Sequence, residues 1–578
     1  MSDVTIGELC GDISVDAMMG DLAEFARRVK LSGTPEELES FRYIQSRLDT
    51  AGFRTEMLSH DAYISLPGAA TLTIGNELLS CITHSFSRPS APGGTSGALV
   101  YLPDGIGPES DVRGRIVVLD GIASPAAGLR ATQAGAIGQI HVSPHEHKHE
   151  MCISSVWGSP SPETLGQLPG TVVVSIARAD GARLQQRLLA GEAITAVITA
   201  EVETGWRKTP ILVAEMAQPD ADPEAPFVLF SGHHDTWYYG VMDNGSANAT
   251  MMEVARLCAT RRDQWRRGLR LCFWSGHSHG RYSGSSWYAD QHWHELERRC
   301  VAHLNIDSTG GVGATVLTDV LTSSELRGMG GEAVHSQAGQ DIVGMRMSRA
   351  GDQSFWGIGV PSMFMGMSEQ SSETSINPTG GVLGGAAKRN GAGFGWWWHT
   401  PDDTIDKIDP VFLERDARVY VHTLWRLLSD DVLCLDYQRW AMDFQAELTR
   451  LQNSLGCVFD ISDLQTRTAN LASNAGALNA QAKMATTPAH YAAINQALMA
   501  VSRALVPIDY TNGDRFAHDP ALGQSAWPPL DPIRRLAGAS GDQARFNAVA
   551  ATRARNRIGH ALDQAIAALD AALAGRRT

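Results

Sequence analysis

The sequence lacks the features that mark a membrane, secreted or nucleic-acid-binding protein. No apolar run approaches the roughly 18 residues of a membrane-spanning helix, and the N-terminal segment has no basic stretch followed by an apolar one. We therefore expect no signal peptide and a cytoplasmic protein. Basic residues number 48 against 63 acidic ones. Nucleic acids and anionic membranes select clustered Lys and Arg, so neither is expected as a partner.

Cysteine is also sparse. The chain has eight cysteines among 578 residues, without a Cys-x-x-Cys spacing. Scattered cysteines at this density are typical of small buried hydrophobic residues in a reducing compartment, and not of a disulfide framework. The cysteine pattern agrees with a cytoplasmic location.

What is present is the composition of an ordinary globular protein, 43% apolar and 19% charged. A chain of 578 residues is too long for one hydrophobic core, so several domains are expected. Changes in the pattern divide the chain into residues 1–75, 76–203, 204–435 and 436–578. The first and third segments form one domain in this interpretation, and the second is inserted between them.

Strand and helix patterns alternate between about residues 205 and 435. Four apolar segments predict strands, and residues 246–262 between the first two predict a helix; the strands are 225–232, 269–274, 301–308 and 360–366. This alternation predicts an α/β fold with a mainly parallel sheet flanked by helices. In such sheets, ligands bind at the carboxyl ends of the strands.

Other segments have different patterns. Residues 34–51 predict a helix that Thr34 caps and that Glu37 completes as a capping box. Short strands separated by Gly and Pro turns predict a β-rich domain over 76–203. After residue 436, amphipathic segments rich in Ala and Leu predict a helical domain for packing or association.

Metal-binding side chains follow the predicted strands. His233 and Asp235 come directly after the first strand, Asp243 precedes a helix, Asp307 ends another strand, and His399 lies in a loop. Two histidines and two aspartates make a ligand set suited to zinc or another borderline divalent ion. Asp235 is placed to support His233 through a hydrogen bond.

These motifs resemble those of the zinc aminopeptidase and glutamate carboxypeptidase family, whose larger members include the non-catalytic transferrin receptor. The matching motifs are Gly-His-x-Asp at 232–235, Asp-Asn at 243–244, Asn-x-Asp at 305–307 and His-Thr-x-x-Asp-Thr at 399–404. The resemblance implies that His233, Asp243 and Asp307 bind a first metal. It also implies that Asp243 bridges to a second metal, which His399 binds.

Weaker similarities extend over most of the chain. Residues 351–365 resemble the family's Ser-Asp-x-x-x-Phe and Gly-[Ile/Val]-Pro motifs, and residues 280–288 resemble Gly-Leu-x-Gly-Ser-x-x-Tyr. Residues 113–140 are similar to the protease-associated domain of larger members, which implies that 76–203 is such a domain. The C-terminal helices resemble the dimerisation domain, so the resemblance implies a homodimer.

The chain departs from the family at Gly-His-Ser-His-Gly, residues 276–280. The family has two adjacent glutamates there, one a general base and the other a ligand of the second metal. Without a gap, His277 takes the position of the base and Ser278 that of the ligand. An imidazole serves as a base near neutral pH, whereas a serine hydroxyl is a poor zinc ligand. His277 or His279 could replace the missing ligand.

Residues 276–280 also match Gly-x-Ser-x-Gly, the nucleophile elbow of serine hydrolases. Such an elbow leads into a helix, and residues 281–286 are a poor helix start because of Gly284. A serine nucleophile would also leave the Gly-His-x-Asp motif unexplained. We therefore favour the metal interpretation.

The expected protein is a metal-dependent hydrolase of an amide bond in a small peptide-like or amino-acid-derived substrate. It would use one or two zinc ions, or manganese or another divalent metal. His277 is the expected general base, and Asp235 orients His233. Two alternatives stay open: a lyase or isomerase acting on a small amino-acid-like molecule, and a non-catalytic binding protein.

Three further segments stand out. Residues 141–150 hold three histidines at alternate positions and form either a solvated loop or a lid over the site. Residues 396–398 are three tryptophans directly before His399, and we expect them to form a hydrophobic wall. Lys388 and Arg389 either bind a carboxylate or are simply exposed.

Overall fold

A mixed twelve-stranded sheet runs through most of the computed structural model, which describes residues 2–373 and 389–575. Ten strands form its main path, in the order β12 (Ser362–Met363), β11 (Cys300–Asn305), β9 (Phe227–His233), β10 (Gly268–Trp274), β8 (Thr195–Met216), β4 (Thr95–Tyr101), β5 (Ile116–Asp120), β6 (Gly138–Val142), β7 (Val172–Ile176) and β3 (Cys81–Thr83). Beside this path, β1 (Arg54–Ile74) pairs with β8 and with β2 (Glu77–Leu79).

The predicted parallel sheet comprises β12, β11, β9 and β10. Side chains of a strand alternate between its two faces, and β9 is buried on both. Val228 and Phe230 pack into one core with α6 (Ala247–Ala259) and α11 (Pro410–Ser429). Phe227 and Leu229 pack into another with α7 (Ser283–Gln291) and α8 (Trp293–Arg299). Helices therefore cover both faces, which confirms the predicted α/β fold.

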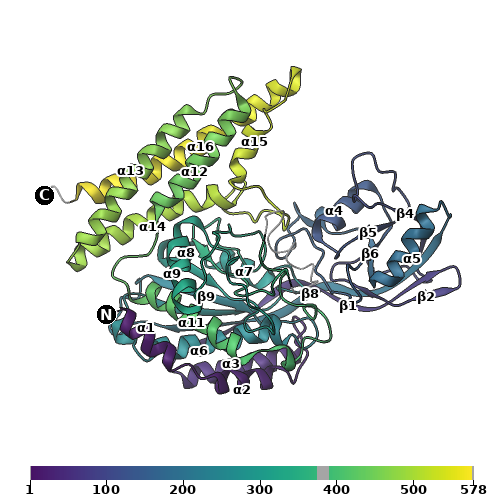
Figure 1. The fold of residues 1–578 in the computed structure, drawn as a ribbon, viewed down its shortest axis with the longest axis horizontal. Helices are drawn as coiled ribbons and strands as arrows, with labels where there is room; N and C mark the ends of the chain where they lie inside the picture. The colour runs from purple at the N-terminus through teal and green to yellow at the C-terminus, as the bar shows by residue number, and fades with distance from the viewer. Residues whose placement is uncertain (1, 374–388, 576–578) are drawn as a thin grey trace.

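The sheet is mixed because of two long strands. β1 and β8 pair antiparallel along their length, and β8 also pairs antiparallel with β10 and β4. β1 is one continuous strand, with a register shift between Pro67 and Ala70. Figure 1 shows β1 and β8 extending from the central lobe into the lobe that holds β4, β5 and β6.

The second lobe has its own hydrophobic core. Its strands are covered by α4 (Pro125–Ala134) and α5 (Arg178–Leu189), and its core draws on residues between Leu72 and Ala200. This core agrees with an inserted domain, and the protease-associated type stays a prediction. All eight cysteines of the chain are free thiols.

The predicted N-terminal helix is α3 (Pro35–Thr50). The Thr34 side chain accepts a hydrogen bond from the Glu37 amide, and the Gly33 amide donates to Glu37 Oε2 at 2.7 Å. In a standard capping box the glutamate side chain accepts from the amide of the N-cap residue; here Glu37 accepts from the amide of Gly33, the residue before the N-cap. Two helices ahead of it, α1 (Ser2–Gly11) and α2 (Val15–Phe25), were not anticipated and add side chains to the central core.

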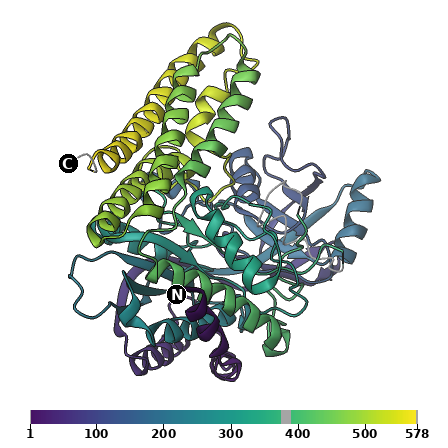
Figure 2. The same cartoon turned by 60° about the vertical axis from the view of Figure 1, so that its left-hand side comes forward.

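The C-terminal segment is helical, as predicted. Its long helices are α12 (Tyr437–Leu455), α13 (Ser462–Met484), α14 (Pro488–Tyr510) and α16 (Gly541–Ala574), and they pack as a bundle beside the central lobe (Figures 1 and 2). Arg503 of α14 joins the bundle to the central lobe by donating hydrogen bonds to the carbonyls of Gly359, Glu297 and Cys300. None of the described helices is long and apolar enough to cross a membrane.

Candidate active site

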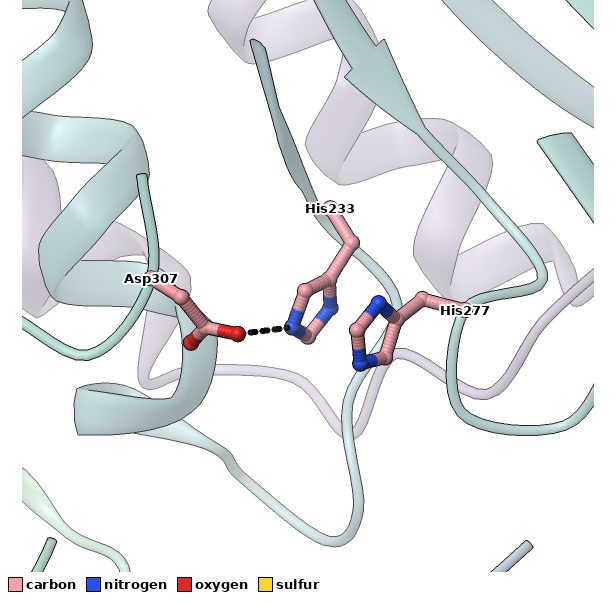
Figure 3. A group of neighbouring side chains, drawn as sticks. All are labelled: His233, His277 and Asp307. Carbon is pink, nitrogen blue, oxygen red and sulfur yellow. Dashed lines mark ion pairs between the residues drawn. The ribbon is translucent and has the colours of Figure 1, made fainter. Parts of the chain in front are cut away.

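The ends of three parallel strands bring the central residues together. His233 is the last residue of β9, His277 follows β10, and Asp307 follows β11. Donor atoms of these three side chains lie within 4.8 Å of one another. Figure 3 shows the His233 imidazole between the Asp307 carboxylate and the His277 ring. The shared edge of the sheet therefore assembles a group that suits a metal ion.

Asp243 lies between two imidazoles. Its Oδ1 is 3.1 Å from His233 Nε2, and its Oδ2 is 3.0 Å from His399 Nε2. His233 Nε2 is also 3.5 Å from Asp307 Oδ2. Burial by itself would raise the pKa of Asp243, but the two imidazoles hold this pKa well below its usual range. The four side chains expected to bind metal are thus neighbours, with Asp243 in the bridging position.

The donor atoms fit a divalent cation. Apart from the contacts just described, His233 Nε2 and Asp243 Oδ1 are buried without a hydrogen-bond partner. Buried polar atoms without partners are rare in native proteins and call for an explanation such as an ion. Two ligands of a tetrahedral zinc, each at ~2.1 Å, are about 3.4 Å apart, close to the 3.1 and 3.5 Å between His233 Nε2 and the two carboxylates. This donor set therefore fits zinc or a similar ion.

Backbone carbonyls orient both histidines. His233 Nδ1 lies 2.9 Å from the carbonyl oxygen of Asp235, and His399 Nδ1 lies 2.7 Å from that of Glu150. A donated Nδ1–H leaves Nε2 free to bind a metal. The Asp235 carboxylate, expected to orient His233, instead accepts hydrogen bonds from the amides of His277 and Ser278, at 3.1 and 2.9 Å.

His277 forms a dyad with Asp352. Its Nδ1 lies 2.7 Å from Asp352 Oδ2, and Asp352 Oδ1 accepts a hydrogen bond from Ser285. The His277 ring stacks on that of His233 with centroids 3.6 Å apart. The His277 side chain is 16% exposed and lines a cavity. Asp352 was not anticipated as a site residue, although it lies in the motif at 351–365.

Asp403 is a second residue that the sequence analysis missed. Its carboxylate accepts hydrogen bonds from the amides of Met242 and Asp243, at 2.8 and 3.0 Å. Burial raises the pKa of Asp403 to about 7, against the effect of these hydrogen bonds. Asp403 therefore holds the turn that carries Asp243. It is the aspartate of the His-Thr-x-x-Asp-Thr motif, which was the one sequence feature that could have indicated its role.

The other two residues of the 276–280 turn do not join the metal group. His279 is buried, with Nδ1 2.9 Å from Ser32 Oγ and 3.8 Å from Asp235 Oδ2, and no hydrogen bond or ion pair links it to the four metal-type residues. Ser278 Oγ is buried without a hydrogen-bond partner. The expectation of a poor helix start after this turn was wrong, because α7 begins at Ser283. A serine nucleophile nevertheless needs a histidine partner, which Ser278 lacks, so the geometry does not favour the serine-hydrolase alternative.

A cavity of about 720 Å³ opens onto this group. The central lobe contributes Asp243, His277, Asp307, His399 and residues 346–351 to its lining. The inserted lobe contributes residues 121–122 and 124–126, Met151 and Cys152, and the C-terminal segment contributes residues 521–526. Of the three tryptophans predicted to form a hydrophobic wall, Trp398 is in this lining.

The histidine-rich segment 141–150 lies against the site. Glu150, besides accepting from His399 Nδ1, donates its amide to the His399 carbonyl at 3.1 Å. The His147 ring stacks on Trp396 with centroids 4.0 Å apart. Of the two basic residues considered earlier, Arg389 pairs with Glu369, and Lys388 lies outside the described residues.

Comparisons with known proteins agree with this geometry. Residues 212–424 match the sequence profile of Peptidase family M28. A probable glutamate carboxypeptidase of Zea mays is 23% identical over 546 residues, which cover 77% of this chain and 72% of the relative. An aminopeptidase of Rattus norvegicus is 23% identical over 348 residues, which cover 52% of this chain and 44% of the relative.

Solved structures share the fold. A Peptidase M28 precursor of Shewanella amazonensis superposes with a TM-score of 0.58 at 17% identity, over 75% of this chain and 98% of the other. An aminopeptidase of an Aneurinibacillus species superposes with a TM-score of 0.54 at 21% identity, over 73% of this chain and 96% of the other. Both similarities establish the architecture that surrounds the site.

Proposed function

We propose that the chain is a metallohydrolase of the zinc exopeptidase-like family and that it cleaves the amide bond of a small peptide-like substrate at a one-metal site, with His277 as the general base. The observation that carries the proposal is the buried contact of His233 Nε2 with the carboxylates of Asp243 and Asp307, beside the His277–Asp352 dyad. The names of the relatives, a glutamate carboxypeptidase and an aminopeptidase, support a peptide-like substrate.

His233, Asp243 and Asp307 would hold the ion, with His399 completing the site. The chemistry that a bound zinc supplies is that of a Lewis acid at the scissile carbonyl. We propose one ion because Ser278 offers no carboxylate where the family places the second metal's glutamate. Asp235 supports the site indirectly, through the amides of the turn that carries His277.

His277 moves the proton. With Nδ1–H donated to Asp352, the lone pair on Nε2 accepts a proton from the attacking water and then passes it to the leaving amine. The Asp352 carboxylate stabilises the imidazolium that forms between these two transfers. Imidazole is suited to both transfers because it titrates near neutral pH.

A second role for His277 has one observation in its favour. Its donor atom lies within 4.8 Å of those of His233 and Asp307, so it could bind the ion itself. The two roles differ in what the side chain does for metal affinity. A ligand is needed for tight binding, whereas a base that contacts only water is not.

The test combines metal analysis with activity on aminoacyl amides and acidic dipeptides. The native chain should hold roughly one zinc or manganese ion. His277→Ala should lower kcat by about 10²–10⁴-fold and keep the metal. Asp352→Asn should lower kcat about 10–100-fold. His335→Ala removes the histidine of an exposed His–Asp pair elsewhere and is the matched control.

Each result has a clear meaning. Loss of metal in His277→Ala would make His277 a ligand. Full activity in that variant would rule out its role as the base. A chain that folds without metal and cleaves no amide would overturn the proposal and favour a binding protein; conversion of an amino-acid-like molecule without hydrolysis would favour a lyase or isomerase.

Three expectations stay predictions: the cytoplasmic location, the homodimer formed through the C-terminal helices, and the protease-associated type of the inserted domain.

A further inference from the structure

The cavity has a second charged end that amide hydrolysis leaves unexplained. The metal-type residues line one part, and Arg281, Arg346 and Arg349 line another. Arg346 has a counter-charge, because its guanidinium pairs with Asp509. Among the described residues, no carboxylate lies within 4 Å of the guanidinium nitrogens of Arg281 or Arg349. Arg281 and Arg349 therefore line the cavity without an ion pair, although the charge of Asp519 acts on Arg349.

Arg281 has an unusual backbone conformation, and so does the residue that follows it. Its φ is 47° and that of Tyr282 is 72°, conformations that carry strain in non-glycine residues and that concentrate at functional sites. Arg281 Nε is buried and has no hydrogen-bond partner. A buried donor without an acceptor is costly, and a ligand oxygen would remove that cost.

Arg349 is held rigidly nearby. Its Nε donates to the carbonyl of Pro520 at 3.0 Å, and another nitrogen donates to the carbonyl of Asp519. Burial lowers the pKa of Arg349 to about 10; the charges of Asp519 and Tyr282 oppose this shift, and repulsion from Arg281 makes the smallest contribution to it. Because both guanidinium groups are positive and line one cavity, an anion between them would be attracted to both.

Two aromatic rings connect the arginines. The Arg281 guanidinium carbon lies 4.8 Å from the centre of the Tyr282 ring, and the Tyr282 ring lies 4.3 Å from that of Trp157. The guanidinium of Arg349 lies 4.4 Å from the Trp157 ring. The edge of Tyr282 also meets the His277 ring, at 4.8 Å. This stack links the arginines to the proposed base.

We propose that Arg281 and Arg349 form an anion subsite that binds a substrate carboxylate distinct from the amide bond that is cleaved. Guanidinium groups suit carboxylates because they present paired donors in a plane. The carboxylate comes either from an acidic side chain or from a chain terminus. The proposal rests on the proposed function only in taking the bound molecule to be the substrate.

The activity test uses four dipeptides of one shape: aminoacyl-glutamate, aminoacyl-glutamine, and the C-terminal amide of each. Wild type should cleave most efficiently the dipeptides that carry the recognised carboxylate. Comparing the four dipeptides shows whether that carboxylate belongs to the acidic side chain or to the chain terminus. Arg281→Leu should lower kcat/KM for those members about 10–100-fold, mainly through KM, and change the neutral member little. Arg281→Lys should retain part of the preference.

A binding test does not depend on hydrolysis. Calorimetric titration of the native chain with glutarate should give binding that Arg281→Leu weakens about 10–100-fold, whereas glutaramide should not bind measurably. Arg346→Lys, in the same cavity but at an arginine that already has a partner, is the matched control and should leave the glutarate affinity unchanged. Unfolding temperatures verify that each variant is folded.

The results separate the two proposals. Equal cleavage of all four dipeptides, with glutarate binding that is indifferent to Arg281→Leu, would overturn the subsite and leave the hydrolase intact. Glutarate binding that requires Arg281 in a chain that cleaves none of the dipeptides would uphold the subsite and count against the hydrolase.

Discussion

The two ends of the active-site cavity are built in different ways. At the metal end, His233, His277 and Asp307 each follow a strand of one parallel sheet, so the sheet itself brings them together. At the arginine end, Arg281 and Arg349 lie on two loops, and the surrounding contacts come from Trp157 and from residues 519–520. The metal-type side chains all come from one domain, with only the Glu150 carbonyl added from the inserted lobe, whereas the arginine end requires three lobes to meet.

The two ends also differ in charge. Carboxylates at the metal end need a cation, and unpaired guanidinium groups at the arginine end need an anion. A substrate with a carboxylate at one side of its scissile amide would satisfy both ends. This difference allows either end to be disabled while the other is measured.

The largest expected effect comes from Asp243→Asn. It removes the carboxylate between His233 and His399, so the chain should lose its metal and kcat/KM should fall about 1,000-fold. Glutarate binding at the arginine end should persist in calorimetry. Asp402→Asn, an exposed neighbour of the metal loop, is the control. Loss of glutarate binding in Asp243→Asn would show that the two ends are not independent.

A smaller effect is expected from Glu325, a buried acidic residue on which the charges of Asp509 and Arg346 act. Burial raises the pKa of Glu325 to about 7, with Asp509 adding to the shift, and neither carboxylate oxygen has a hydrogen-bond partner. Because the folded-state pKa lies above the unfolded value, the protonated group contributes stability below about pH 4.5. That contribution is lost as the pH rises through about 7.

Glu325→Gln stays neutral at every pH. It should match wild type near pH 4.5 and exceed it at pH 9 by about 3 kcal/mol in the free energy of unfolding. Urea denaturation at both pH values measures the difference. The exposed control Glu109→Gln should change stability by less than about 0.5 kcal/mol. An unchanged difference between pH 4.5 and 9 would mean that Glu325 does not ionise on its own in the folded chain.

The smallest expected change concerns metal content. Ser278→Glu places a carboxylate at the family's second-metal position, so the content should rise from roughly one ion per chain towards two. Ser278→Ala should leave it unchanged. A content that does not rise with glutamate would mean that residue 278 faces away from the second position, and the one-metal site would then have another cause.

The sequence predicted the α/β fold, the helical C-terminal domain and the four metal-type residues, because apolar periodicity marks strands and the site residues directly follow them. It missed Asp352 and Asp403. Both lie in loops, and each acts by holding another residue, His277 or the turn of Asp243. Likewise, backbone carbonyls orient His233 and His399, and a carbonyl is present at every position.

The sequence by itself determined which chemistry the metal end holds, since the apolar strand patterns and the residues that follow them are local properties of the chain. Only the tertiary structure decided that Arg281 and Arg349 share a cavity with that chemistry. Their approach depends on long-range packing between the inserted lobe, the central lobe and the C-terminal segment. No local pattern encodes such packing, because each contact joins residues far apart in the chain.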